Sequence, residues 1–230
     1  MPRRLLIYSH DSFGLGHLRR CRAIAHHLVE RFSDLSVLIL SGSPIVGSFD
    51  YKARVDFVRV PGVIKLRNGE YTSLHLHIDP DHTLAIRSSI IQHTAEVFDP
   101  HVCLIDKEPL GLRGEVRDTL AMLKARGTRI VLGLRDVMDE PAALMEEWER
   151  KQVYPALRQF YDTIFVYGPP TVFDPLTELP GFDEFAEKVR FTGYLRRTLP
   201  TYDGRCHQTE NALPDRPYIL VTPGGGGDGE

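Results

Sequence analysis

The sequence predicts an α/β protein with a doubly wound parallel sheet, and two observations support this fold class. First, short apolar segments of strand type recur along the 230-residue chain, at residues 4–9, 36–41, 56–60, 101–106, 129–134, 163–167 and 189–193. Most of them are continuously apolar rather than alternating, as expected for strands that are covered on both faces. Second, helical patterns lie between several of these segments, and strands that alternate with helices favour parallel pairing.

The helices expected between the strands are marked by apolar stripes and by their ends. The stripes consist of Leu18, Cys21, Ala25 and Leu28, of Leu84, Ile91, Ala95 and Phe98, and of Val116, Leu120 and Leu123. The Asp-Pro-Asp sequence at 79–81 predicts an N-terminal cap for the second helix, which should start at about Thr83. Asp139 and Pro141 predict the start of a fourth helix, which Pro155 should break or kink.

The composition is that of an ordinary globular protein and excludes several classes. With a net charge of −3 the chain carries no strong electrostatic footprint for nucleic acid. Cys21, Cys103 and Cys206 are isolated, which argues against a disulfide framework and a structural zinc site and suits a reducing cytosol. No run approaches the ~20 apolar residues of a membrane span, and Leu5 to Tyr8 is too short for a signal peptide. We therefore expect a cytoplasmic protein without a transmembrane segment.

The end of the chain differs from the rest. Residues 1–197 carry the strand and helix pattern, whereas residues 198–216 are polar, contain prolines and glycine, and predict an interdomain linker. A strand pattern resumes at Tyr218 and runs into a glycine-rich loop, whose consecutive N–H groups would form a nest for a phosphate or diphosphate. We expect residues 217–230 to be the first strand and phosphate loop of a second, Rossmann-like domain, which makes the chain a fragment. A flexible tail is the alternative.

A glycine turn with a histidine follows the first strand. That strand should end near Ser9, the turn contains Gly14 and Gly16, and a helix should begin near His17. Glycines permit a tight turn and close approach of a ligand, and a helix start offers unpaired N–H groups to an anion. His17 would lie at the carboxyl edge of the sheet, where open α/β sheets bind ligands. A turn needed only for packing is the alternative. The third glycine of a dinucleotide fingerprint is missing, because Arg19 occupies its place.

Asp106 lies at the carboxyl end of a buried strand and should reach the same sheet edge as His17. Its carboxylate could accept the Nδ1–H of His17, fix the tautomer and raise the basicity of Nε2. Alternatively, Asp106 caps the turn before Pro109. We expect the two side chains to lie within hydrogen-bond distance or to be bridged by one water.

A histidine-rich segment at 75–82 is a candidate metal site. His75, His77, Asp79, Asp81 and His82 lie close together, and His-x-His on an extended segment places both rings on one face. The helix cap at 79–81 accounts for the aspartates more simply. We therefore predict no metal site.

Four segments resemble the GT-B glycosyltransferases: "GLGHLRR" at 14–20, "LIDKEPLG" at 104–111, "GLRDVMDEP" at 133–141 and "VTPGGGGDGE" at 221–230. Within that group the chain is similar to predicted bacterial glycosyltransferases related to the N-acetylglucosaminyltransferase that makes lipid II. The resemblance covers the amino-terminal domain and the beginning of the carboxy-terminal one. It implies an acceptor-binding first domain, a second domain that binds the nucleotide-sugar, and catalysis in the cleft between them.

The resemblance also implies roles for individual residues. His17 would be the general base toward an acceptor hydroxyl, oriented by Asp106. The donor diphosphate would lie on Gly224, Gly225, Gly226, Gly227, Asp228 and Gly229. Gly14 and Gly16 would belong to the acceptor-side loop, with Arg135 and Asp136, although a surface ion pair accounts equally well for the last two.

The implied reaction inverts the sugar and uses no metal or cofactor, the nucleotide-sugar being a substrate. The acceptor would be a glycan, a lipid-linked molecule or a small molecule, and a peripheral position at the inner membrane surface is compatible with it. Two alternatives stay open. The segment "GLGHLRRCRAIA" also resembles nucleotide-sugar hydrolases of nonulosonic acid synthesis, in which His17 would activate water. The chain could also be a binding domain without activity of its own.

Overall fold

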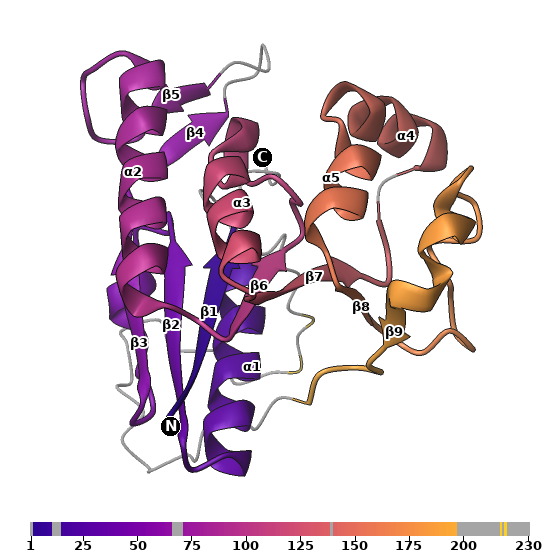
Figure 1. Ribbon diagram of the computed structural model, residues 1–230, viewed down its shortest axis with the longest axis horizontal. Coiled ribbons are helices and arrows are strands. Elements are labelled where there is room, and N and C mark those ends of the chain that lie inside the picture. The colour runs from indigo at the N-terminus through magenta and orange to yellow at the C-terminus, as the bar shows by residue number, and fades with distance from the viewer. Residues whose placement is uncertain are drawn as a thin grey trace.

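Seven parallel strands form the central sheet of the computed structural model, which describes residues 2–10, 15–65, 71–138 and 140–196 together with Pro217 and Ile219 (Figure 1). The strands are β1 (Arg3–Ser9), β2 (Leu35–Ser41), β3 (Val55–Arg59), β6 (Val102–Asp106), β7 (Arg129–Arg135), β8 (Thr163–Tyr167) and β9 (Val189–Phe191). Their order is β3-β2-β1-β6-β7-β8-β9, and every neighbouring pair is parallel. The predicted strands and the predicted doubly wound parallel sheet are confirmed. The predicted linker and second-domain start, at 198–230, lie outside the described residues apart from 217 and 219.

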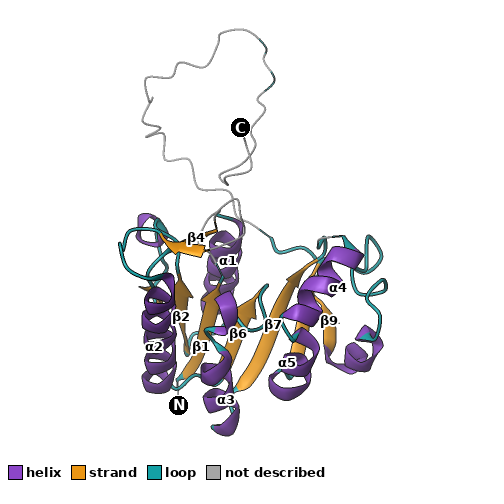
Figure 2. Ribbon diagram, turned by 90° about the horizontal axis from the view of Figure 1, so that it is seen from above, coloured by secondary structure: helices purple, strands orange, loops and turns teal. Residues whose placement is uncertain are grey.

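Helices cover both faces of the sheet. The α-helices are α1 (Gly16–Arg31), α2 (Pro80–Phe98), α3 (Arg117–Ala125), α4 (Pro141–Arg150) and α5 (Val153–Phe160), and short 3₁₀ helices span Val46–Ser48, Leu112–Gly114 and Phe182–Lys188. Helix α1 packs on β1 and β2 on one face, whereas α2, α3 and α5 line the other face (Figure 2). Each face therefore has its own apolar core, as a doubly wound sheet requires.

A second, two-stranded sheet was not predicted. It pairs β4 (Val63–Lys65) with β5 (Tyr71–Ser73) in antiparallel register. Each strand has three residues, which is too short to show alternation in the sequence. The pair lies beside the upper end of α2 in Figure 1, beyond the carboxyl ends of β1 and β2.

The predicted helix boundaries hold with small shifts. The Asp79 side chain caps α2 by accepting from the backbone N–H of Asp81 at 2.7 Å, so the helix begins at Pro80 rather than Thr83. Helix α4 starts at Pro141, as expected. The predicted break near Pro155 is real but falls earlier, at Gln152, which adopts a left-handed conformation between α4 and α5. Pro155 then occupies the first turn of α5, where a missing N–H costs no hydrogen bond.

The stripe expected for α2 needs correction. Ile91 and Ala95 are buried, but Leu84 and Phe98 are only half-buried, and Thr83 and Arg87 take the buried positions nearer the start of the helix. On α1, likewise, Val29 is buried and Leu28 is half-buried. Arg87 was not expected in the core, because an unpaired buried cation is very costly.

Arg87 is tolerated inside because a carboxylate accompanies it. Its Nε and Nη2 atoms each donate to Glu115 at 2.6 Å, and both side chains are 1% exposed. Tyr8, from β1, donates its hydroxyl to the same carboxylate at 2.5 Å. Burial and the Glu115 charge raise the pKa of Tyr8 well above its ordinary value, so the hydroxyl remains a donor. This buried network, Tyr8–Glu115–Arg87, joins β1, α2 and the segment that precedes α3.

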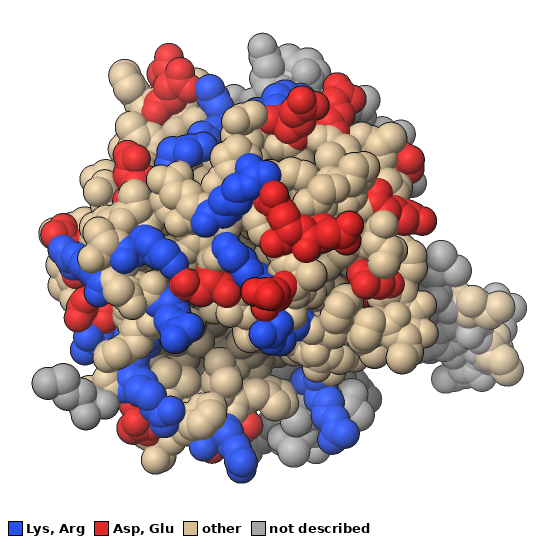
Figure 3. Space-filling model, turned by 45° about the vertical axis from the view of Figure 1, so that its right-hand side comes forward, with Lys and Arg blue, Asp and Glu red and all other residues tan. Residues whose placement is uncertain are grey.

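The outer surface mixes charges of both signs. On the face shown in Figure 3, basic and acidic side chains lie next to one another, in keeping with the net charge of −3. Lys151, for example, contacts both Glu108 and Glu147. Among the described residues, no helix has the length and apolar character needed to cross a membrane.

Candidate functional site

Asp106 ends β6 at the carboxyl edge of the sheet, on the face that α1 covers. Side chains alternate along a strand, so Asp106 shares the orientation of Leu104, which packs in the α1-side core. In the sheet register Asp106 lies between Ser9 of β1 and Gly133 of β7. The chain then turns at Lys107, with φ of 68°. Strand alternation and register therefore place the Asp106 carboxylate at the middle of the carboxyl edge of the sheet, beneath the start of α1.

His17 reaches this carboxylate from the first turn of α1. Its Nδ1 lies 2.6 Å from Oδ2 of Asp106, so the predicted proximity of the two residues at one sheet edge is confirmed. The neighbouring Gly16 begins the helix, and a β-carbon there would meet no atom within 4 Å.

Arg20 completes the contacts of Asp106 and was not among the predicted site residues. Its Nε donates to Oδ1 at 2.9 Å and its Nη2 donates to Oδ2 at 2.8 Å. The Asp106 side chain is fully buried, whereas those of Arg20 and His17 are 13% and 20% exposed. His17 is therefore the most exposed member of this His17–Arg20–Asp106 cluster.

The charge of Asp106 fixes the position of the proton on His17. Burial alone would raise the pKa of Asp106, but the hydrogen bonds from His17 and Arg20 and the Arg20 charge outweigh it and lower the pKa. An ionised carboxylate can only accept hydrogen bonds, so Nδ1 of His17 donates to it. Arg20 Nη2 also lies 2.9 Å from Nδ1, but a protonated Nδ1 cannot accept from it. Nε2 of His17 has no hydrogen-bond partner among the described residues.

Two uncharged rings flank the cluster. The His10 ring, directly after β1, lies 6.4 Å from the His17 ring and nearly perpendicular to it. Burial, with His17 and nearby cations adding to it, lowers the pKa of His10 to about 3. The Arg20 guanidinium lies 5.2 Å from the ring centre of Tyr167. Burial first, and then the Asp106 charge, raise the pKa of Tyr167 well above its ordinary value. Both flanking rings are therefore uncharged at neutral pH, and the cluster pairs the Arg20 cation with the Asp106 anion.

The remaining predicted residues are less informative. Gly14 and the loop at 224–229 lie outside the described residues. Arg135 is exposed, Asp136 accepts from the backbone N–H of Val137 at 3.0 Å, and the structure records no ion pair between Arg135 and Asp136. The surface ion pair considered from the sequence is thus absent, and a role in the acceptor cleft stays untested.

The histidine-rich segment stands apart from this cluster. His75 and His77 are exposed, and Asp79 is engaged as the cap of α2. Within the described ranges, no group of three or more His, Cys, Asp or Glu side chains could hold a metal ion.

Arg20 and Tyr167 could have been found from the sequence. Residues three apart on a helix share a face, so the Arg20 side chain belongs beside that of His17. Tyr167 ends a predicted strand at the same edge as Asp106, with the same alternation. Basic pairs such as Arg19-Arg20 are common on surfaces, however, and nothing in the pair itself marks which member turns inward.

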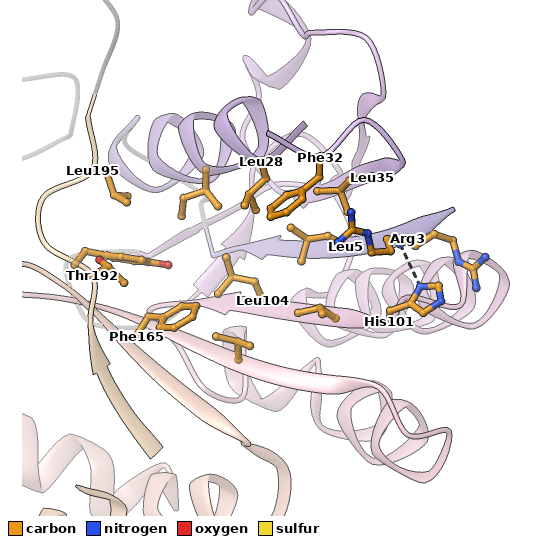
Figure 4. Close-up of a pocket in the computed structure, with 15 residues that line it drawn as sticks. Arg3, Leu5, Leu28, Phe32, Leu35, His101, Leu104, Phe165, Thr192 and Leu195 are labelled. Carbon is orange, nitrogen blue, oxygen red and sulfur yellow. Dashed lines mark hydrogen bonds between the residues drawn. The ribbon is translucent and has the colours of Figure 1, made fainter. Parts of the chain in front are cut away.

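A separate apolar groove of about 340 Å³ runs along the α1 face of the sheet. In Figure 4, Leu28 of α1 and Phe32, directly after α1, face Leu104 of β6 and Phe165 of β8 across it. The groove extends from the amino ends of the strands to Tyr167, whose ring centre lies 5.2 Å from the Arg20 guanidinium. Its lining lacks His17 and Asp106, so the candidate active site is the sheet edge and not this groove.

Comparisons with known proteins identify the fold. No family model and no curated protein matches the chain. Among solved structures, it is similar to a UGT transferase from Siraitia grosvenorii in complex with UDP, with a TM-score of 0.52 and 13% sequence identity. The similarity covers 84% of this chain and 51% of that one, so the chain spans about half the length of the solved structure. At this identity the similarity shows the fold, a Rossmann-like α/β domain of the GT-B type.

Proposed function

We propose that this chain is the acceptor-side half of a glycosyltransferase that moves a sugar from a nucleotide-sugar to an acceptor hydroxyl. The observation that carries the proposal is the 2.6 Å hydrogen bond between His17 and buried Asp106 at the carboxyl edge of the sheet. With Nδ1 engaged by Asp106, Nε2 of the half-buried His17 is the nitrogen proposed to take the acceptor proton, at the edge where open α/β sheets bind ligands. The GT-B type of fold supports the reaction class.

In the proposed reaction, Nε2 of His17 removes the proton of the acceptor hydroxyl while its oxygen attacks the anomeric carbon. The new carbon–oxygen bond forms as the bond to the nucleoside diphosphate breaks, and the leaving group departs with the bonding electrons. In-line attack inverts the anomeric centre. The proton ends on Nε2, and Asp106 stabilises the resulting imidazolium through the Nδ1–H bond.

The donor half of the reaction rests on the sequence. Backbone N–H groups of residues 224–229 are proposed to bind the diphosphate and to stabilise its growing charge without a metal or other cofactor. The division into a first domain at 1–197, a linker at 198–216 and a second domain from 217 belongs to the same proposal. So do a cytoplasmic location and a kinship with the enzymes that make lipid II, whose acceptors are lipid-linked.

The test is a product assay on the protein that carries this sequence, using UDP-, GDP- and TDP-sugars with a panel of acceptors. His17→Ala should lower turnover by ~10²–10⁴-fold, the usual effect of removing a general base, and should leave folding intact. Arg113→Met is the control, because Arg113 lies at the surface in an exposed ion pair with Asp81. Activity of His17→Ala within a few-fold of that of the control would remove His17 from the mechanism.

The same assay separates transfer from hydrolysis. Nucleotide release that requires the acceptor and yields a glycosylated product supports a transferase. Release with water alone, at the same rate with or without acceptor, would replace the proposal by a nucleotide-sugar hydrolase. EDTA should leave the activity intact, and a loss that a divalent ion restores would contradict metal independence.

A further inference from the structure

Arg20 makes more contacts than a solvent-exposed helix residue requires. It donates through two different nitrogens to the two oxygens of Asp106, at 2.9 and 2.8 Å. Its guanidinium also lies 5.2 Å from the ring centre of Tyr167. Hydrogen bonds at Nε and Nη2 and an aromatic ring below restrict the guanidinium in position and in plane. Arg19, the preceding residue, is exposed and makes none of these contacts.

We infer that Arg20 is the positioning residue of the site: it holds the Asp106 carboxylate so that Oδ2 accepts the Nδ1–H of His17, and its charge keeps His17 unprotonated at Nε2. The contacts on which this rests are recorded in the structure. The consequence for a general base rests on the proposed function.

The first part of the inference follows from geometry. A carboxylate with no exposed surface has no water to satisfy its lone pairs, so its orientation is set by its protein donors. The planar fork of Arg20 occupies both oxygens from one side and leaves the remaining lone pair of Oδ2 directed at His17. A lysine at this position would carry the same charge, but its single ammonium group could not hold both carboxylate oxygens in one plane.

The second part follows from electrostatics. A lone buried carboxylate beside an imidazole strongly favours the imidazolium, which would occupy Nε2 with a proton. Arg20 opposes that effect, because its charged Nη2 stands 2.9 Å from the same Nδ1. Among the described residues, the groups recorded beside His17 are His10, directly after β1, Arg20 on its own helix and Asp106 from β6. His10 is neutral, so Arg20 is the cation that balances Asp106.

The experiment measures the protonation of His17 directly and needs no substrate. The 230-residue chain is isotopically labelled at its histidine nitrogens, and imidazole NMR spectra are recorded as a function of pH. The His17 signals are identified by their loss in His17→Gln. In the wild-type chain we expect one tautomer, with the proton on Nδ1 and none on Nε2.

Three variants test the role of Arg20. Arg20→Met should move the pH at which His17 becomes protonated upward, on the order of one unit or more, because a neighbouring charge is lost. Arg20→Lys retains a charge for the buried carboxylate and so protects the fold, but without the planar fork His17 should become a mixture of Nδ1–H and Nε2–H forms. Arg19→Met, the matched control, should reproduce the wild-type spectra.

The outcomes are decisive in both directions. If Arg20→Lys keeps the single wild-type tautomer and the wild-type titration, the positioning role is wrong, even where Arg20→Met does not fold. If the predicted changes occur in a protein whose His17→Ala variant retains full transferase activity, the positioning role stands and the proposed function fails. If the Arg20→Met spectra match those of Arg19→Met, the inference that the Arg20 charge affects protonation of His17 is wrong.

Discussion

The hydroxyl of Tyr167 lies against the α-carbon of Gly133, so closely that a β-carbon on Gly133 would stand 1.9 Å from Tyr167 Oη and 2.6 Å from Cζ. Gly133 is the neighbour of Asp106 in the sheet, whereas Tyr167 is paired with Arg135. The tyrosine ring therefore leans back along the sheet over the glycine, and Arg20 stacks on it. Because Gly133 has no side chain, the Tyr167 ring can lie beneath the Arg20 guanidinium.

Gly133→Ala should consequently destabilise the protein. The new methyl group forces Tyr167 to move, and overpacking of this kind costs about 1–3 kcal/mol. Gly47→Ala is the control, since its β-carbon would meet only Phe57, at an ordinary 3.5 Å. Chemical denaturation of both variants measures the difference. The double variant Gly133→Ala/Tyr167→Leu should recover part of the loss, and equal stability of the two single variants would refute the steric argument.

The buried network Tyr8–Glu115–Arg87 should respond asymmetrically to substitution. Glu115→Leu leaves the Arg87 guanidinium and the Tyr8 hydroxyl without their acceptor, and removal of one member of a buried pair costs about 3–5 kcal/mol. Adding Arg87→Met should restore much of the loss, because no unpaired charge then stays inside. Asp81→Ala, which breaks the exposed pair with Arg113, should cost less than about 1 kcal/mol. Urea unfolding of this set tests the prediction, and a double variant less stable than Glu115→Leu alone would contradict it.

His10 should make the folded state sensitive to mild acid. His10 as a residue is half-buried, but its Nδ1 is enclosed and has no hydrogen-bond partner among the described residues. Its pKa falls from the ordinary 6.5 to about 3 on folding. Between these values the unfolded chain binds a proton that the folded chain does not, so stability decreases as pH falls, by at most about 1.4 kcal/mol per pH unit.

His10→Gln should flatten this dependence. The measurement is the free energy of unfolding at several pH values from about 7 to about 4.5, a window that lies above the titration of Asp106, whose pKa is lowered. His93→Gln is the control, because that side chain is 77% exposed. An identical slope for wild type and His10→Gln would show that His10 is not protected from protonation.

The chain by itself should bind nucleotide-sugars weakly and turn nothing over. In the proposed division of labour the donor is held mainly by a second domain, whose first strand and phosphate loop we assign to residues 217–230. A phosphate nest also depends on N–H groups with fixed directions, and ordering a free glycine-rich segment costs roughly 1–2 kcal/mol per residue. Calorimetry with UDP-, GDP- and TDP-sugars tests this. Micromolar binding by residues 1–230 would place the donor site in the first domain.

Much of the fold could be predicted because the informative patterns are local. Short apolar segments of strand type marked all seven strands of the main sheet, and Asp79 and Pro80 marked the start of α2. The pair His17–Asp106 was also within reach, because parallel strands bring their carboxyl ends to one edge. The features that could not be predicted are those that depend on contacts between residues far apart in the sequence. Arg87 looks like a surface residue until Glu115, 28 positions away, is placed beside it.

The same limit applies within the site. The inward turn of Arg20 is decided by Asp106 and Tyr167, which come from distant strands. Which of two adjacent arginines is functional is therefore a property of the assembled sheet. Helical spacing from His17 narrows the choice to Arg20, but only once a buried carboxylate on the α1 face is known to exist.

His17 and Asp106 stand 89 positions apart, and this separation has a consequence for biosynthesis. In the sheet, β1 lies between β2 and β6. During synthesis β2 follows β1 closely, whereas β6 is made much later. At the usual ~5–20 residues per second, on the order of ten seconds of translation separate the emergence of His17 from that of Asp106. Throughout that interval Asp106 is not available to Arg20, and β1 has no partner along its second edge. Formation of the His17–Asp106 contact therefore reports that the two halves of the sheet have joined.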